Sequence, residues 1–293
     1  MSTVQAALNQ GAQLLSGHGQ EAGRMSAARL DAQILLAHIL GVDRSVLYAD
    51  PHRVLTPEEE LQYHALLERR AKGEPVAYLT GHKEFYGLDF LVDRRVLIPR
   101  PETELLVEAA LRICREKLEA GHLPIVADIG TGSGAIPIAI AVNEPRLPYL
   151  YASDISVDAL AVAGLNSRRH HVEGRIRLLH GDLDAALPEP VDVLTANLPY
   201  IASGEVQQMQ DDVLLYEPHL ALFSGTNGLA HIERLFTNLA HSSTLSPGAV
   251  LLLEIGYTQR DTLAHLLETL WPLARVIFIR DYAGWDRVVQ VSL

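Results

Sequence analysis

The stretch Ile125-Val126-Ala127-Asp128-Ile129-Gly130-Thr131-Gly132-Ser133-Gly134 decides the fold of this chain. Its first half is a short apolar run, which is typical of a strand buried inside a parallel sheet. Its second half has glycine at every other position, and glycine permits a sharp turn and a close approach to a ligand that a Cβ would block. We therefore expect a strand, a glycine loop and a helix in succession, with a ligand at the carboxyl end of the strand.

Further short apolar runs extend this pattern toward the C-terminus. Together with the first, they cover residues 125–129, 149–153, 176–179, 191–196, 250–255, 276–280 and 288–293. Helical stretches separate most of them, and this alternation is typical of an α/β fold. Residues 281–287 are too few for a parallel crossover, so the final strand should be antiparallel. The sequence thus predicts a mostly parallel seven-stranded sheet with helices on both faces, the architecture of class I methyltransferase-type folds.

The N-terminal region has a different, purely helical pattern. Residues 26–40 have apolar residues at helical spacing and end before Gly41, a natural helix stop. In Thr56-Pro57-Glu58-Glu59, Thr56 can cap a helix, Pro57 suits its first turn and Glu59 can complete a capping box. The pattern fits a structural helical bundle and a partner-docking domain equally well.

A change of composition follows this helical region. Residues 76–98 mix aromatic and turn-forming residues, as a β-hairpin does, and a helix should run from Glu102 to about Ala120. We therefore predict a helical N-terminal domain at residues 1–75, a β-hairpin connector at residues 76–98, and the α/β methyltransferase-type domain at residues 99–293.

Composition limits the cellular context and the partners. Apolar residues make up 48% of the chain, but no apolar run is long enough to cross a membrane. The N-terminus has no signal-peptide pattern and Cys114 is the single cysteine, so we expect a cytoplasmic protein. The formal net charge of −12 argues against direct binding of nucleic acid. The 13 histidines show no metal-ligand spacing, so no metal is expected, and we expect a monomer.

Acidic residues at two further strand ends indicate the ligand. Asp154 ends the second predicted strand and can accept hydrogen bonds from both hydroxyls of a ribose. Asp182 follows the third strand and can contact an adenine amine, with Leu183 packing on the ring. Because carboxylates suit a cofactor with a sulfonium and an ammonium group and no phosphate, we predict S-adenosyl-L-methionine. Its predicted binding residues are Asp128, Gly130, Thr131, Gly132, Ser133, Gly134, Asp154, Asp182, Leu183 and Asn197.

The motif Asn197-Leu198-Pro199-Tyr200 ends the fourth strand, beside the glycine loop. An amide nitrogen is a poor nucleophile, so methyl transfer requires that its hydrogens be held and its lone pair be turned toward the methyl group. The Asn197 side-chain oxygen can accept one hydrogen and the Leu198 backbone carbonyl the other. Tyr200 can pack on the planar amide or base. Asn197, Pro199 and Tyr200 are the predicted catalytic residues, and positioning carries the catalysis.

Two other functions would use some of the same residues. An enzyme that methylates adenine or guanine in nucleic acid would flip a base against Tyr200, but the acidic net charge argues against it. A non-catalytic binding protein with this fold would not need Asn197, Pro199 and Tyr200 intact. Methylation of an amide nitrogen therefore fits the residues best.

The sequence resembles the bacterial release-factor glutamine methyltransferases along nearly its whole length. The shared segments are residues 75–81, 84–87, 98–105, 128–134, 197–200, 216–218, 221–223, 253–256, 283–284 and 287–289. The segment Arg100-Pro101-Glu102-Thr103-Glu104 is the most specific of them. It looks like the release-factor enzymes rather than the relatives that methylate a glutamine of a ribosomal protein, which remain the alternative.

The resemblance implies a substrate and a role for the N-terminal domain. The substrate would be the glutamine in the Gly-Gly-Gln loop of peptide chain release factors, and the helical domain would help to dock the release factor. The implied substrate-binding residues are Asn197, Leu198, Pro199, Tyr200, Arg100 and Glu102. Arg100 and Glu102 fit the start of a helix equally well. Leu198 replaces a proline of the family motif, but Pro199 biases it toward an extended conformation in which its carbonyl can still point as required.

Overall fold

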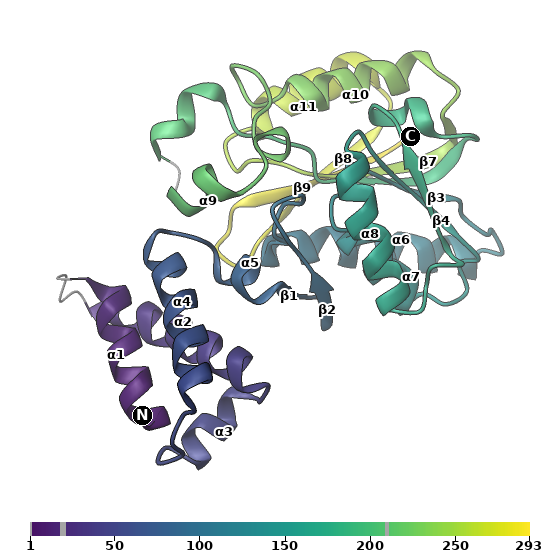
Figure 1. Ribbon diagram of the computed structural model, residues 1–293. Coiled ribbons are helices and arrows are strands. Elements are labelled where there is room, and N and C mark those ends of the chain that lie inside the picture. Colours follow the sequence, from purple (N-terminus) through teal and green to yellow (C-terminus); the bar gives the residue numbers. More distant parts are fainter. Residues whose placement is uncertain (1, 18–21, 209–210) are drawn as a thin grey trace. The chain divides into compact units, whose positions relative to one another are not determined.

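The computed structural model describes residues 2–17, 22–208 and 211–293. Their contacts form two compact units, Met1–His82 with Gln210–Tyr216, and Lys83–Met209 with Glu217–Leu293. The first unit is helical and the second contains the main sheet (Figure 1). Within the described ranges, no helix is long and apolar enough to cross a membrane.

The first unit is a group of helices around its own core. The helices are α1 Val4–Ser16, α2 Ala22–Leu40, α3 Arg44–Ala49, α4 Pro57–Ala71, α5 Val76–Thr80 and α9 Asp211–Tyr216. Buried apolar side chains of α1, α2 and α4 form most of the core, in which the Tyr63 hydroxyl donates to the Ala32 carbonyl oxygen at 3.1 Å. The capping box of Thr56 and Glu59 is confirmed at the start of α4, and Gly41 directly follows α2 with a positive φ.

The helix α9 joins this unit from a distant part of the sequence, between β6 and β7. Asp212 lies 4.0 Å from the Arg70 guanidinium, and the Tyr216 hydroxyl donates to the Lys72 carbonyl oxygen at 3.1 Å. These polar contacts connect α9 to the last turn of α4 and the residue that follows it.

The segment at residues 76–98 contains the predicted hairpin and also a helix. The strands β1 His82–Phe85 and β2 Leu88–Leu91 are joined by Tyr86 and Gly87, whose φ values of 52° and 74° suit a tight two-residue turn. The residues before the hairpin form α5 instead. Pro75 caps this helix and Gly81, at φ 76°, ends it.

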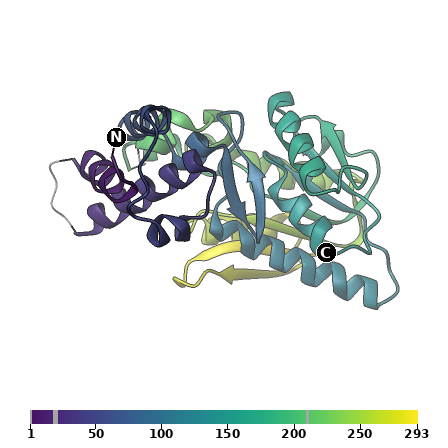
Figure 2. The same cartoon turned by 60° about the horizontal axis from the view of Figure 1, so that its bottom comes forward.

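The main sheet has the strand order β5-β4-β3-β6-β7-β9-β8. Its strands are β3 Val126–Ile129, β4 Leu150–Asp154, β5 Ile176–His180, β6 Val191–Ala196, β7 Leu245–Glu254, β8 Arg275–Arg280 and β9 Asp286–Ser292. Every predicted strand is confirmed, and β9 is antiparallel to both β7 and β8, as its short connection requires. Figure 2 shows the β8–β9 hairpin in yellow. The chain thus forms the sheet edge with β8 and returns through β9 to pair with β7.

Helices cover both faces of this sheet, as the alternation predicts. They are α6 Glu104–Glu119, α7 Ala135–Asn143, α8 Val157–Arg169, α10 Ala230–His241 and α11 Arg260–Leu270, with the short 3-10 turns η1 Pro101–Thr103, η2 Leu183–Ala186, η3 Ser203–Gln208 and η4 His219–Ala221. Figure 1 shows α10 and α11 on one face and α6, α7 and α8 on the other. Buried apolar residues of α10 and α11 share one core cluster with β6, β7 and β9.

Candidate active site

The carboxyl ends of neighbouring strands bring the predicted site residues together. The strands β4, β3, β6 and β7 are adjacent and parallel, so their last residues lie along one edge of the sheet. This edge carries Asp128 on β3, Asp154 on β4, Asn197 directly after β6, and Glu254 on β7. Open α/β sheets hold their ligands at this edge.

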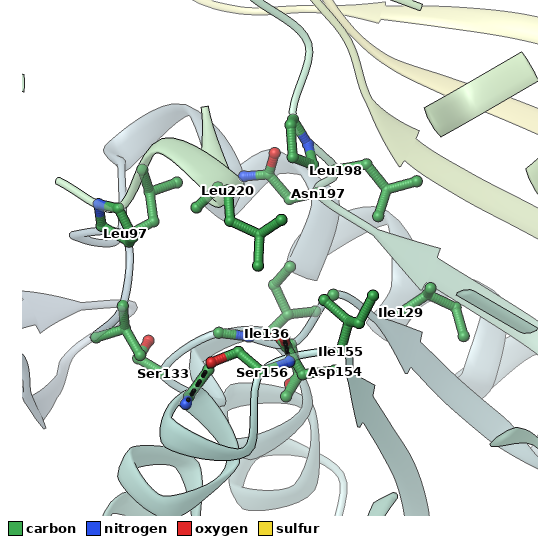
Figure 3. A pocket seen from close by; sticks show the side chains of 18 of the residues that line it. Leu97, Ile129, Ser133, Ile136, Asp154, Ile155, Ser156, Asn197, Leu198 and Leu220 are labelled. Carbon is green, nitrogen blue, oxygen red and sulfur yellow. Dashed lines mark hydrogen bonds between the residues drawn. The ribbon is translucent and has the colours of Figure 1, made fainter. Parts of the chain in front are cut away.

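A cavity of about 280 Å³ opens there (Figure 3). In Figure 3, Asn197 and Leu198 lie across the cavity from Ser133, Ile136 and Asp154. The predicted site residues that line it are Arg100, Gly130, Thr131, Gly132, Ser133, Asp154, Asp182, Leu183, Asn197, Leu198 and Pro199. The predicted site residues outside its lining are Glu102, Asp128, Gly134 and Tyr200.

The glycine loop needs glycine at each of its three positions. Gly130, Gly132 and Gly134 have φ values of 72°, 55° and 79°, which residues with a side chain rarely adopt. A Cβ on Gly134 would lie 2.9 Å from Ile138 Cδ1, and one on Gly130 would lie 3.0 Å from Leu198 Cδ2. The loop therefore packs closely against both the following helix and Leu198.

Asp154 holds the loop from the neighbouring strand. Its Oδ2 accepts a hydrogen bond from the Gly132 backbone N–H at 2.8 Å, and its Oδ1 accepts one from the Ser156 N–H at 2.9 Å. Burial raises the pKa of Asp154 above its ordinary value, and these backbone N–H groups oppose the rise. Each carboxylate oxygen keeps a further acceptor position, so the side chain can hold the loop and bind a ligand at the same time.

Asp128 and Thr131 each carry a buried polar atom, and the nearby Thr131 hydroxyl opposes the rise in the Asp128 pKa that burial causes. Asp128 is 1% exposed, and its Oδ1 accepts a hydrogen bond from the Thr195 hydroxyl at 2.7 Å. Among the described residues, its Oδ2 and the Thr131 Oγ1 have no hydrogen-bond partner. Burial raises the pKa of Asp128 to about 7. Since unpaired buried polar atoms are costly, a ligand that supplied the missing bonds would be favoured here.

Asp182 already has a basic partner. Its Oδ1 lies 2.5 Å from the guanidinium of Arg234 on α10, and both side chains are about half exposed. Both residues line the cavity together with Leu183, which is buried and has a φ of 50° that is uncommon for leucine. Arg234 thus places a positive charge at this end of the cavity, and the sequence did not predict this charge.

Two residues orient the Asn197 side chain. Its Nδ2 donates to Thr103 Oγ1 at 3.1 Å and to Glu254 Oε2 at 3.0 Å. Because an ionised carboxylate only accepts hydrogen bonds, the amide nitrogen faces Glu254 whenever that carboxylate is ionised. In the part of the chain that the structure describes, neither Asn197 Oδ1 nor the Leu198 carbonyl oxygen has a hydrogen-bond partner. The two acceptors that the predicted amide grip requires are therefore both available.

The Leu198 side chain has a packing role. It is 5% exposed and belongs to the core cluster that includes β6, β7 and α10. Its contact with Gly130 joins the Asn197–Tyr200 motif to the glycine loop. Leu198 therefore contributes apolar packing through its side chain, and its carbonyl oxygen remains available for the predicted amide grip.

Tyr200 lies behind the cavity lining. Its hydroxyl donates to Glu254 Oε1 at 3.4 Å, and its carbonyl oxygen accepts a hydrogen bond from Gln259 Nε2 at 3.0 Å. Burial raises the pKa of Tyr200. A Cβ on Gly228 would lie 2.2 Å from the Tyr200 carbonyl oxygen, so this contact requires glycine. The packing of the Tyr200 ring on a substrate stays a prediction.

Arg100 and Glu102 occupy different positions. Arg100 lines the cavity and pairs at 2.5 Å with Glu217, whose side chain is 1% exposed. Glu102 is exposed in η1 and lies outside the cavity lining. Glu102 lies at the start of η1, where its exposed carboxylate suits a helix start and also stays available to a substrate, whereas Arg100 lines the cavity.

Thr103 and Glu254 are candidate site residues to which the sequence analysis assigned no role. Glu254 is 2% exposed, and burial raises its pKa to about 7. Glu254 lies at the carboxyl end of a parallel strand, where open α/β sheets hold their ligands. The same position identified Asp154 as a candidate, so the sequence could have identified Glu254 as well. Thr103 gives no such signal, since it is 94 positions from Asn197 in the sequence and only folding brings the two together.

Known proteins resemble this chain over nearly its whole length. A family model described as the PrmC N-terminal domain matches residues 6–81, and one described as the methyltransferase small domain matches residues 106–226. The release factor glutamine methyltransferase of Koribacter versatilis is 39% identical over 272 residues, which cover 92% of each chain. That of Cereibacter sphaeroides is 40% identical over 273 residues, which cover 93% of each.

A solved structure supports the fold alone. The hMettl16 catalytic domain in complex with an RNA hairpin has a TM-score of 0.55 at 15% identity, and the match covers 78% of this chain and 81% of that one. Fold and family together imply a methyl donor of the S-adenosyl-L-methionine type. Because the identity to the two bacterial relatives extends over almost the full length of both chains, this protein belongs to the release factor glutamine methyltransferase family.

Proposed function

We propose that this protein transfers a methyl group from S-adenosyl-L-methionine to the side-chain amide nitrogen of the glutamine in the Gly-Gly-Gln loop of peptide chain release factors. The observation that carries the proposal is the pair of acceptors, Asn197 Oδ1 and the Leu198 carbonyl oxygen, which no described residue uses. Both residues line a cavity that also contains Asp154 and Asp182. Membership of the family supports the choice of substrate.

Two acidic residues of the cavity, Asp154 and Asp182, suit a cofactor with positive groups. S-adenosyl-L-methionine supplies an electrophilic methyl group on a sulfonium. Asp154 has acceptor positions for ribose hydroxyls, and Asp182 can accept from the adenine amine when Arg234 moves aside. Thr131, whose hydroxyl oxygen has no hydrogen-bond partner among the described residues, also lines the cavity. We assign cofactor binding to Asp128, Gly130, Thr131, Gly132, Ser133, Gly134, Asp154, Asp182, Leu183 and Asn197.

The protein contributes to the reaction by positioning the substrate amide. Asn197 Oδ1 accepts one N–H hydrogen and the Leu198 carbonyl oxygen accepts the other, so the nitrogen lone pair points into the cavity. Both hydrogen bonds also polarise the N–H bonds toward their acceptors and favour the positive charge that develops on nitrogen. Bound S-adenosyl-L-methionine would supply the methyl group: the nitrogen–carbon bond would form as the sulfur–carbon bond of the sulfonium broke to leave a neutral thioether, and the surplus proton would pass from the nitrogen to water. We assign substrate binding to Asn197, Leu198, Pro199, Tyr200, Arg100 and Glu102.

The partner in this proposal is a protein. The helical domain at residues 1–75 would dock the release factor, and the match of residues 6–81 to a separate N-terminal family supports a distinct module. The net charge of −12 favours a protein over nucleic acid. The proposal includes a monomer that acts in the cytoplasm, without direct contact with nucleic acid or a membrane.

A methylation assay with labelled S-adenosyl-L-methionine tests the proposal. Purified release factor, ribosomal protein and nucleic acid are offered to the protein separately. We expect label on the release factor only, and no label when the glutamine of its Gly-Gly-Gln loop is replaced. Label on nucleic acid or ribosomal protein alone would refute the proposed substrate.

A further inference from the structure

We infer that Glu254 and Thr103 are positioning residues that determine which end of the Asn197 amide faces the substrate. The inference rests on the proposed function and concerns the same site. Each of the three side chains contacts the other two. Thr103 Oγ1 donates to Glu254 Oε2 at 2.6 Å, while Asn197 Nδ2 donates to Glu254 Oε2 at 3.0 Å and to Thr103 Oγ1 at 3.1 Å.

The donors and acceptors of this triangle select one arrangement. Above its pKa of about 7, Glu254 is ionised and has no hydrogen to donate, so it turns the Thr103 hydroxyl hydrogen and one Asn197 N–H toward itself. The Thr103 oxygen has then used its single hydrogen and can accept the second N–H of Asn197. Both hydrogens on Nδ2 are thereby used, and Oδ1 is what the amide offers to the cavity. A flipped amide would place Oδ1 against the carboxylate and lose these bonds.

The burial of Glu254 and Thr103 strengthens their preference for one orientation of the Asn197 amide. Glu254 is 2% exposed and Thr103 is 4% exposed, so water cannot replace bonds that a flipped Asn197 would lose. The Tyr200 hydroxyl adds a donor to the other carboxylate oxygen at 3.4 Å, and the positive charge of Arg287 opposes the rise in the Glu254 pKa that burial causes. The amide is therefore held by a carboxylate that packing fixes in place.

The orientation matters because the substrate must donate here. A glutamine amide nitrogen carries two hydrogens that need acceptors, while its lone pair must stay free for the methyl group. Asn197 in the observed orientation offers an acceptor. In the flipped orientation it would offer N–H donors, which repel the substrate N–H groups. Glu254 and Thr103 therefore act on the reaction through Asn197, without contact with the reacting nitrogen.

Paired substitutions at Thr103 test this inference. Thr103→Val keeps the shape of the side chain and removes the hydroxyl, whereas Thr103→Ser keeps the hydroxyl. With a release factor as substrate, we expect Thr103→Val to lower kcat by about 10- to 100-fold. Thr103→Ser should restore kcat to within about threefold of wild type. The KM for the release factor should change little, because one amide contact is a small part of a protein–protein interface. The calorimetric dissociation constant for S-adenosyl-L-methionine should also change little, because Asp154 and the glycine loop are left as they are.

A substitution at Glu254 tests the coupling. Glu254→Gln should lower kcat to a similar extent, because its amide can face Asn197 with either its oxygen or its nitrogen. The double variant with Thr103→Val should be no slower than the slower single variant, since both changes act through one amide. If Thr103 and Glu254 had purely structural roles, the losses of kcat in the two single variants would add in the double variant. Rates are normalised to the protein that binds cofactor, so a misfolded fraction does not affect the comparison.

Two substitutions on the exposed side of α11, Thr269→Val and Glu268→Gln, are matched controls and should behave as wild type. Wild-type kcat for Thr103→Val, or additive losses in the double variant, would overturn the inference while wild-type protein still methylated the release factor. Failure of the wild-type protein to methylate the release factor would instead overturn the proposed function, and this inference with it.

Discussion

Replacing Gly134 by alanine should destabilise the second unit more than replacing Gly121, although both have a φ of 79°. At Gly121 a Cβ would have no atom within 4 Å, so alanine should cost about 1 to 2 kcal/mol for the left-handed conformation alone. At Gly134 the Cβ would lie 2.9 Å from Ile138 Cδ1 and 3.3 Å from Ala163 Cα. Both neighbours are fully buried, so this overpacking should add about 1 to 3 kcal/mol.

Urea unfolding followed by tryptophan fluorescence measures this difference, because the two tryptophans, Trp271 and Trp285, both lie in the second unit. For a denaturant slope of about 3 kcal/mol per M, Gly134→Ala should lower the midpoint by about 1 M and Gly121→Ala by about 0.5 M. Equal shifts for the two variants would refute the packing argument. An unchanged midpoint for Gly134→Ala would also refute the backbone conformation of the loop.

Three further predictions concern the cavity and its buried acids. Asn197→Ala should lower the kcat of methylation by about 100-fold or more. Calorimetry should find only a modest loss of cofactor affinity, because Asp154 and the glycine loop still hold the cofactor. Full turnover would contradict the amide grip. Arg234→Ala should tighten cofactor binding several-fold, because it frees Asp182 from its ion pair. The melting temperature should change little, because a half-exposed ion pair contributes little to the free energy of folding. Weaker cofactor binding would count against the assigned role of Asp182. The free energy of unfolding should fall as the pH rises from about 4.5 to about 7. In the folded protein, Glu254 and Asp128 keep their protons up to a pKa of about 7. In the unfolded chain the same carboxyls release their protons near pH 4, so proton release favours the unfolded chain over this range. Urea titrations at a series of pH values should show that Glu254→Gln reduces this fall by about 3 kcal/mol, and a fall equal to that of wild type would contradict the raised pKa of Glu254.

Local patterns were sufficient to predict the elements of the fold. Each apolar run became a strand, because a strand buried on both faces needs apolar residues at consecutive positions. The glycine loop was predictable because its three positive φ values are a local demand of the backbone. The direction of β9 followed from the length of one connection. One local pattern was misleading: Tyr78 and Leu79 resemble hairpin residues, yet they lie in α5 between Pro75 and Gly81.

Residues close together in the chain therefore specify the strands, the glycine loop and the motif that follows β6. The tertiary structure decided how the motif is supported. Thr103 meets Asn197 across 94 positions, Glu254 meets it across 57, and Arg100 meets Glu217 across 117. No local periodicity encodes such pairs, because they form only when the ends of separate strands and η1 reach the same edge of the sheet. The sequence predicts that Asn197 grips an amide, and the hydrogen bonds of Glu254 and Thr103 orient the side-chain amide of Asn197.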